Sequence, residues 1–377
     1  MLRVDAITLR EIRLPLKEPF RISSGVTTER RILLLELHHP DGVAGWSECV
    51  AGEEPNYSAE TIDTAWHAIT AWLAPRVLGR AFAVPDDVAP ALGRDIVGHP
   101  MAKAAIEMGM WELAARLQSL PLARVLGGTR DRIPVGISIG IQRDPAALVE
   151  RASAALAQGY RKIKMKIAPG KDVEYLRAVR EALGPRAPLM ADANSAYTIA
   201  DADHLAELDP LGLMMIEQPL AQDDIVRHAA LQRRLTTPIC LDEAILDADR
   251  AEDMIALGAG RIVNIKPGRV GGFASSRAIH DVCARAGVPV WCGGMLESGI
   301  GRAHNVALAS LPNFTLPGDL SPSARYWERD IVTPEWTMDA EGMVKVPLAR
   351  PGIGVTVDTD RVDQLTVRTQ TLTGRTT

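Results

Sequence analysis

The 377-residue sequence predicts an α/β fold: a (β/α)8-type barrel, a modified TIM barrel, with an α+β capping domain made from the N- and C-terminal segments. The chain is longer than one ordinary domain and accommodates a barrel of about 250 residues together with a second domain. Short apolar runs alternate with helix-like segments through its middle. Five charged residues each follow such a run, at intervals of 24 to 26 residues: Lys166, Asp192, Glu217, Asp242 and Lys266. The interval matches one strand, one helix and their two loops.

Residues 1–128 are predicted to form most of the capping domain. The alternating segments RVDAITLREIRLPL and RRILLLELHH predict antiparallel strands, and Pro40-Asp41-Gly42 predicts a turn before a third strand. Helical spacing of apolar residues follows at about 58–78 and 98–118. Residues 332–377 look strand-like, and we expect them to return to this domain.

Residues 129–331 are predicted to form the barrel. The candidate strands are PVGISIGI, KIKMKI, PLMADAN, LMMIEQP, PICLDEA, RIVNIKP, PVWCGGM and FTLPGDL, with helix-like segments after the first six. Strands joined by helices run parallel. Eight of them close into a barrel whose active site lies at their C-terminal ends, where the charged residues fall.

Composition excludes several classes of protein. The net charge of −5 leaves no electrostatic footprint for nucleic acid. The four cysteines lack zinc-ligand spacing and suggest no disulfide framework. The N-terminal segment has no signal-peptide core, and no stretch of ~18 apolar residues occurs. We therefore expect a soluble cytoplasmic protein with no membrane partner.

Lysines occupy one face of the second predicted strand. Side chains alternate across a strand, so Lys162, Lys164 and Lys166 share a face, and apolar residues take the other. The apolar face belongs against helices, which turns the lysines into the barrel. They are tolerable there only near anions and a wet mouth. The alternative is a solvated edge strand with a basic face.

Asp192, Glu217 and Asp242 end strands three, four and five, so their carboxylates converge. Three such anions repel one another unless a cation lies among them. An all-oxygen ligand set favours a hard ion, Mg²⁺ or another divalent cation such as Mn²⁺. Taken singly, each acid could instead be a helix cap or a surface charge.

Lys266 ends strand six, which lies across the barrel from strand two. A metal-bound substrate carboxylate would place its α-carbon between Lys166 and Lys266. This arrangement suits abstraction of a proton α to the carboxylate, through an enediolate, with Lys164 lowering the pKa of the base and binding the carboxylate. A barrel that merely binds an acidic ligand would need no such base.

These motifs resemble the enolase superfamily, in its muconate-lactonising-enzyme subgroup, marked by Lys164-Met165-Lys166 and a lone Lys266. The segments IEQPL, DANSAYT, LDEAI and VWCGGMLESGIGRAHNVALASLPNFTLPGDLSPSARYW resemble o-succinylbenzoate synthases that also racemise N-acylamino acids. The resemblance implies Mg²⁺ on the three acids and Lys166 and Lys266 as the acid/base pair. It also implies substrate contacts from Ser138, Asn194, Gly293, Gly294, Met295, Phe20, Tyr57 and Tyr326, although simple packing explains each of these equally well.

Two activities share such a site: dehydration to o-succinylbenzoate, a menaquinone step, and racemisation of N-succinyl or other N-acyl amino acids. An arginine at the place of Arg269 accompanies racemase activity in related proteins, which favours racemase competence. Dipeptide epimerases usually carry Asp-x-Asp where this chain has Asp319-Leu320-Ser321, and muconate cycloisomerases remain open. Relatives often form homo-octamers, so we expect an oligomer.

Overall fold

The central strands of the chain pair side by side in sequence order. The structure, a computed structural model that describes residues 1–22 and 25–374, joins seven of them in the order β13-β12-β11-β10-β9-β8-β7, and every neighbouring pair is parallel. They are β7 (Ile137–Ile139), β8 (Ile163–Lys166), β9 (Leu189–Asp192), β10 (Ile216–Glu217), β11 (Ile239–Leu241), β12 (Ile262–Ile265) and β13 (Val290–Cys292). The strand–helix alternation therefore predicted the sheet correctly.

The eighth predicted strand, FTLPGDL, closes the ring by isolated contacts rather than by a full ladder. Phe314 bridges Val290 on one side and Gly318 bridges Val135 on the other, both in parallel. Pro317 lies inside this segment and has no N–H to donate, which limits regular pairing. The barrel fold is confirmed, with its last strand reduced to bridges.

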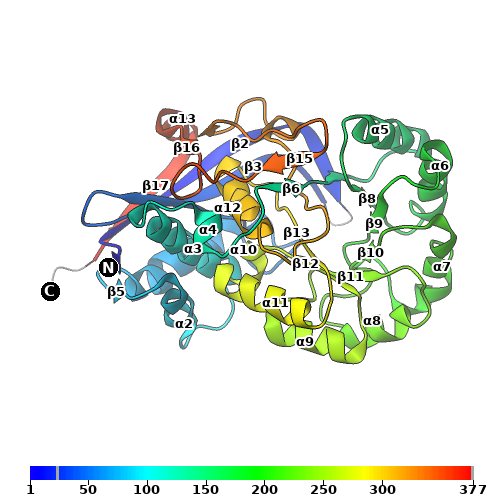
Figure 1. Ribbon diagram of the computed structural model, residues 1–377, viewed down its shortest axis with the longest axis horizontal. Helices are drawn as coiled ribbons and strands as arrows, with labels where there is room; N and C mark the ends of the chain where they lie inside the picture. Colours follow the sequence, from blue (N-terminus) through cyan, green and yellow to red (C-terminus); the bar gives the residue numbers. More distant parts are fainter. Residues whose placement is uncertain (23–24, 375–377) are drawn as a thin grey trace.

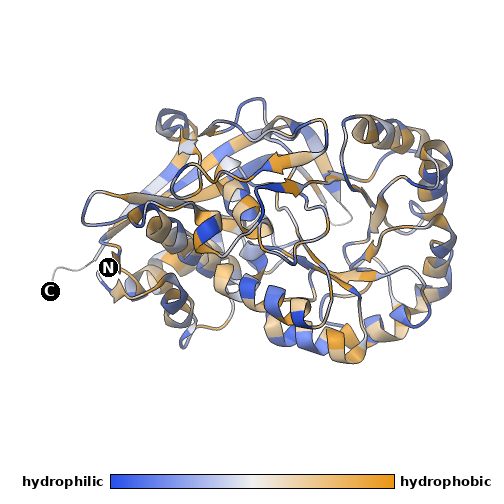
Figure 2. Ribbon diagram, in the orientation of Figure 1, coloured by the Kyte–Doolittle hydropathy of each residue, from blue (hydrophilic) through white to orange (hydrophobic). Residues whose placement is uncertain are grey.

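Helices surround the sheet, as Figure 1 shows. They are α5 (Pro145–Ala157), α6 (Val173–Leu183), η4 (Ile199–Asp201), α7 (Ala202–Ala206), η5 (Asp209–Leu211), α8 (Ile225–Gln232), α9 (Ala248–Leu257), α10 (Pro267–Val270), α11 (Phe273–Arg285) and α12 (Gly299–Ala309). Figure 2 shows hydrophobic and hydrophilic positions alternating along α9 and α11, as expected of helices that cover a sheet on one side.

The capping region is a sheet of order β17-β2-β3-β4, antiparallel throughout, with helices beside it. Its N-terminal elements are β1 (Leu2–Arg3), β2 (Ala6–Ile22), β3 (Gly25–His38), β4 (Ala44–Cys49), α1 (Ile62–Ala68), η1 (Ile69–Leu73), η2 (Ala74–Arg76), β5 (Ala81–Phe82), η3 (Pro85–Asp87), α2 (Val88–Gly93), α3 (Pro100–Leu117), α4 (Leu122–Val125) and β6 (Arg132–Pro134). The elements after the barrel helices are η6 (Ser323–Arg325), β14 (Val332–Thr333), β15 (Met343–Lys345), β16 (Thr356–Val357), α13 (Thr359–Leu365) and β17 (Thr366–Thr373).

The C-terminal strand β17 lies along β2, where red meets blue in Figure 1. The last segment thus returns to the first, although α13 was not expected from its pattern. The domain limits at residues 128 and 331 stay a prediction.

Strand β3 is buried on both faces. Leu33, Leu35 and Leu37 pack in an apolar cluster with the cap helices. Ile32 and Leu34 pack in the larger cluster that includes the barrel. This explains the continuous apolar run ILLL at residues 32–35, because a strand with two covered faces need not alternate. Within residues 1–22 and 25–374, no helix is both long and apolar enough to cross a bilayer.

Two buried glutamates of the cap reach the first turns of barrel helices. Glu48 of β4 accepts from the backbone N of Ser298 and Gly301, each at 3.1 Å, at the start of α12. Glu107 of α3 accepts from Phe273 N at 2.8 Å and Ala274 N at 2.9 Å, at the start of α11. Amide groups at a helix start lack intrahelical partners and favour an anion, so these contacts bind the cap to the barrel.

Candidate active site

The lysine-bearing strand β8 lies inside the barrel sheet. It is paired with β7 on one side and β9 on the other, so the edge-strand alternative is wrong. Ile163 and Met165 face the apolar core. Lys162 and Lys164 are buried, at 0% and 3% exposure, within the ring. The alternation of side chains along the strand therefore predicted correctly that the lysines point into the ring.

Lys164 and Lys166 of β8 contact the side chains of acids and of one asparagine. Lys166 Nζ lies 2.6 Å from Asp192 Oδ2 and donates to Asn194 Oδ1 at 2.5 Å. Lys164 Nζ lies 3.0 Å from the same Asp192 oxygen and 3.1 Å from Glu217 Oε2. Burial lowers the pKa of Lys166, and the charge of Lys164 acts in the same direction against the attraction of Asp192. The expected direction of the pKa shift is therefore present at Lys166.

The three predicted metal ligands stand at the ends of adjacent strands. Asp192 and Glu217 are direct register partners on β9 and β10. Asp242 follows the last residue of β11. Burial first, and then the charge of Asp192, raise the pKa of Glu217. These two carboxylates are therefore close enough to repel each other.

Lys266 approaches from the far side of the ring, directly after β12. Its Nζ lies 2.7 Å from Asp242 Oδ2 and donates to the Tyr57 hydroxyl at 2.9 Å. Burial lowers the pKa of Lys266, but the acidic groups around it, Tyr57 and then Glu243, outweigh burial and raise the pKa overall. The two lysines therefore differ, and the expectation of a lowered pKa does not extend to Lys266. A Cβ at Gly293 would come within 2.7 Å of Lys266 Cε, so the glycine leaves room for this side chain.

Arg269 and Lys266 contact the same carboxylate, that of Asp242. It is buried on α10, its Nη1 contacts Asp242 Oδ1, and its Nη2 donates to the carbonyl of Asn264 at 2.8 Å. Gly268 beside it packs against the cap, because a Cβ there would meet Val50 Cγ2 at 2.3 Å. Pro267 and Gly268 thus begin the short helix α10, which brings Arg269 into contact with Asp242.

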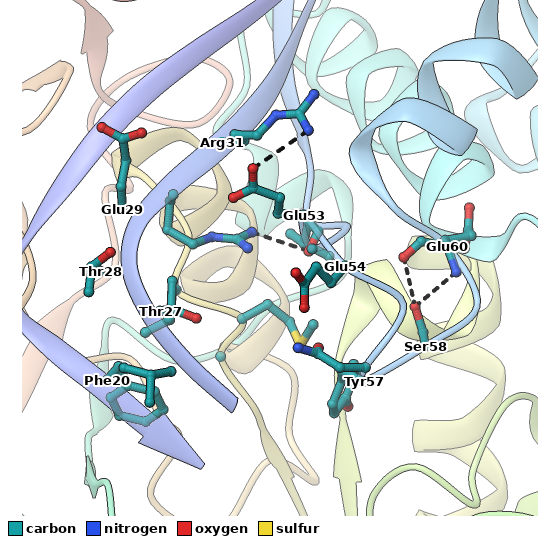
Figure 3. Close-up of a pocket in the computed structure, with 18 of the residues that line it drawn as sticks. Phe20, Thr27, Thr28, Glu29, Arg31, Glu53, Glu54, Tyr57, Ser58 and Glu60 are labelled. Carbon is teal, nitrogen blue, oxygen red and sulfur yellow. Dashed lines mark hydrogen bonds and ion pairs between the residues drawn. The ribbon is translucent and has the colours of Figure 1, made fainter. Parts of the chain in front are cut away.

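A cavity of about 460 Å³ lies between the barrel mouth and the cap. Figure 3 shows its cap wall, where Glu53, Glu54 and Tyr57 come from the loop after β4. Of the predicted site residues, the lining includes Phe20, Tyr57, Lys166, Asn194, Lys266, Gly294 and Met295.

Eight predicted site residues lie outside this lining: Lys164, the three acids Asp192, Glu217 and Asp242, Arg269, Ser138, Gly293 and Tyr326. Ser138 is the register partner of Lys164 on β7, and its buried hydroxyl has no hydrogen-bond partner in the described part of the chain. Tyr326 is buried, with the guanidinium groups of Arg302 and Arg325 over its ring. These residues stand beneath or beside the cavity, and their roles stay predictions.

Sequence reasoning missed two acids of the site. Glu243 accepts from Asn194 Nδ2 at 2.8 Å, and Asn194 in turn binds Lys166. Asp319 lies between Lys162, the residue just before β8, and Lys164 of β8, 3.1 Å from Lys162 Nζ and 2.6 Å from Lys164 Nζ. The three inward lysines indicated that acidic groups must lie near them. Strand alternation could not identify Glu243 and Asp319 as those acids, because it gives no direction for a residue beyond the end of a strand.

The donor set fits a hard divalent cation. Asp192, Glu217 and Asp242 offer only carboxylate oxygens, the ligands that Mg²⁺ prefers. Burial and, after it, repulsion by Asp192 raise the pKa of Glu217, and a bound cation relieves such repulsion. In this structure the acids bind amines instead, and among residues 1–22 and 25–374 no three histidine, cysteine or acidic side chains gather as one ligand group.

Comparisons with known proteins agree with this geometry. Residues 4–127 match the model of the mandelate racemase / muconate lactonizing enzyme N-terminal domain, and residues 147–361 match the enolase C-terminal domain-like family. The chain is 49% identical to an o-succinylbenzoate synthase from Geobacillus stearothermophilus, covering 97% of this chain and 96% of that protein. It is 47% identical to an N-succinylamino acid racemase from Amycolatopsis, covering 97% and 98%.

Among solved structures, an enolase-superfamily member from Listeria innocua superposes with a TM-score of 0.95. The two chains are 40% identical, and the match covers 99% of this chain and 100% of that one. The likeness therefore extends over both the barrel and the cap.

Proposed function

The chain belongs to the enolase superfamily, in the family of o-succinylbenzoate synthases and N-succinylamino acid racemases, and from that premise we propose that it removes the proton α to the carboxylate of a small-molecule substrate. One observation carries the proposal: two amines, those of the partly buried Lys166 and the buried Lys266, line the same cavity. They come from β8 and β12, strands two and six of the ring, and so face each other across it. A substrate between them presents one face to each amine.

Asp192, Glu217 and Asp242 are the proposed ligands of Mg²⁺, or of another hard cation such as Mn²⁺. Such a cation, when bound, neutralises the charge that develops on the substrate carboxylate as the α-proton leaves. Lys164 stands beside Asp192 and Glu217 and is positioned to donate to the same carboxylate. Phe20, Tyr57, Asn194, Gly294 and Met295 are the proposed cavity contacts with the rest of the substrate.

In racemisation of an N-succinyl or other N-acyl amino acid, one lysine accepts the α-proton and the other donates a proton to the opposite face. Arg269 supports this activity because it binds Asp242, the carboxylate that also holds Lys266. In o-succinylbenzoate synthesis, Lys166 accepts the proton and returns it to the leaving hydroxyl, while the charge of Lys266 stabilises the enolate from the other face. Relatives named for each activity match this chain about equally well, so we propose both.

Dipeptide epimerase activity is disfavoured by the acid on the eighth barrel segment. The Asp319 carboxylate is engaged by Lys162 and Lys164. The hydroxyl of Ser321 donates to the carbonyl of Gly136 at 3.1 Å, and neither residue lines the cavity. The geometry offers no acid here for a substrate ammonium group.

Deuterium exchange tests the proposal. With Mg²⁺ in D₂O, we expect the protein to exchange the α-proton of an N-succinyl amino acid and to convert one enantiomer into the other. Lys166→Met and Lys266→Met should each abolish racemisation, and each should retain exchange with the enantiomer that faces the remaining amine. Absence of exchange with any N-acyl amino acid, together with no dehydration to o-succinylbenzoate, would reject the function; exchange that EDTA does not affect would reject the metal.

Assembly and location are proposed from the family alone: a homo-octamer in the cytoplasm. Light scattering on the purified protein measures the first, and a monomer would contradict it.

A further inference from the structure

Asp319 occupies a rigid position at the closing point of the barrel. Its backbone N donates to the carbonyl of Cys292 at 2.9 Å, and its own carbonyl accepts from Arg302 Nη1 at 2.8 Å. A Cβ at Gly294 would come within 2.7 Å of the same carbonyl oxygen. The residue is 5% exposed. Its carboxylate is therefore held inside the ring from the side opposite β9 and β10.

The carboxylate joins Lys164 of β8 to Lys162, the residue just before this strand. Its Oδ1 lies 3.1 Å from Lys162 Nζ, and its Oδ2 lies 2.6 Å from Lys164 Nζ. Lys162 is fully buried and lies 3.2 Å from the centre of the Trp291 ring. Lys162 thus has the ring and Asp319 to stabilise its charge.

Lys164 is the residue for which the choice of partner matters. Its amine touches Asp192 at 3.0 Å and Glu217 at 3.1 Å, two of the three carboxylates proposed for the cation. An amine bound only to these acids would compete with a divalent cation for their oxygens. The contact with Asp319 is the shortest of the three and gives the amine a partner that is not one of the proposed metal ligands.

We infer that Asp319 is a positioning residue, which holds Lys164 from the eighth barrel segment so that Asp192 and Glu217 can exchange this amine for the divalent cation and the amine can donate to the substrate carboxylate. The inference rests on the proposed function and deepens it. It assigns to the eighth barrel segment a part in metal affinity, although that segment contributes none of the proposed ligands.

The affinity for Mn²⁺ in the absence of substrate tests this role. We expect Asp319→Asn to bind Mn²⁺ about 10- to 100-fold more weakly than the unchanged protein, the usual effect of losing a partner that orients a metal site. Free Mn²⁺ can be followed by electron paramagnetic resonance during a titration. The matched control is Glu107→Gln, a buried carboxyl at the cap–barrel interface, which should leave the affinity unchanged.

A second variant separates positioning from charge balance and folding. The double variant Lys162→Met, Asp319→Asn also removes the lysine that loss of the Asp319 carboxylate would leave unpaired. It therefore keeps the net charge of the protein and has no buried, unpaired lysine at position 162. Positioning predicts that its Mn²⁺ affinity stays low and that kcat falls more than KM rises. Wild-type affinity in either Asp319 variant would overturn the inference. If the unchanged protein exchanges no α-proton, the proposed function fails, while the Mn²⁺ comparison still decides the role of Asp319.

Discussion

Buried carboxylates at the barrel mouth and at the cap–barrel interface lose the same hydration and are satisfied by different partners. At the mouth, Asp192, Glu217 and Asp242 bind the amines of lysine side chains. At the interface, Glu48 and Glu107 bind backbone N–H groups at the starts of α12 and α11. Side-chain amines can move aside for a metal or a substrate, whereas backbone donors cannot. The carboxylates at the mouth can therefore exchange their amine partners for a metal or a substrate, whereas those at the interface keep the same backbone partners.

The largest expected effect separates activity from stability at the mouth. Asp242→Asn removes a charge that Lys266 and Arg269 share. We expect kcat/KM to fall by roughly a thousandfold, because several kcal/mol of charge stabilisation by a metal are lost. The free energy of unfolding should change less than in the interface variant below. Steady-state kinetics gives kcat/KM, and denaturant unfolding of the same preparation gives the free energy of unfolding. A variant that loses much of its unfolding free energy but keeps its kcat/KM would contradict this difference between mouth and interface.

The opposite pattern is expected at the interface. Glu107→Leu keeps the volume of the side chain and removes both acceptors of Phe273 N and Ala274 N. Each buried donor without a partner costs about 1–3 kcal/mol, so the loss of both should lower the free energy of unfolding by roughly 2–6 kcal/mol. Turnover measured well below the unfolding transition should persist. Loss of turnover in a fully folded variant would show that the interface also serves the chemistry.

A smaller effect concerns pH and sharpens the comparison. Burial raises the pKa of Glu48 and of Glu107 to about 7, above the usual ~4.3 of an unfolded glutamate. Between these values the folded protein keeps protons that the unfolded chain releases, so stability falls as pH rises from about 4.3 to 7 and levels off above. Glu107→Gln removes one such proton, so the decline in unfolding free energy across this window should be shallower. An unchanged slope would mean that Glu107 is ionised throughout.

The chain's regular spacing made part of this arrangement predictable. Lys166, Asp192 and Glu217 sit at the C-terminal ends of their strands, where alternation fixes direction and adjacency follows from strand order. Glu243 and Asp319 lie past the ordered strands, where alternation no longer applies and only the folded loops bring them inward. Glu107 lies in the middle of α3, and nothing local indicates that it reaches the start of another helix 166 residues away.

The contact between Gly268 and Val50 limits how modular the two halves of the enzyme can be. The turn after Lys266 has no room for a side chain because the cap fills that space. A chimaera that grafts a relative's cap onto this barrel would have to bring a residue of matching size at position 50. New combinations of cap and barrel within the superfamily are thus constrained by the steric fit between positions 268 and 50.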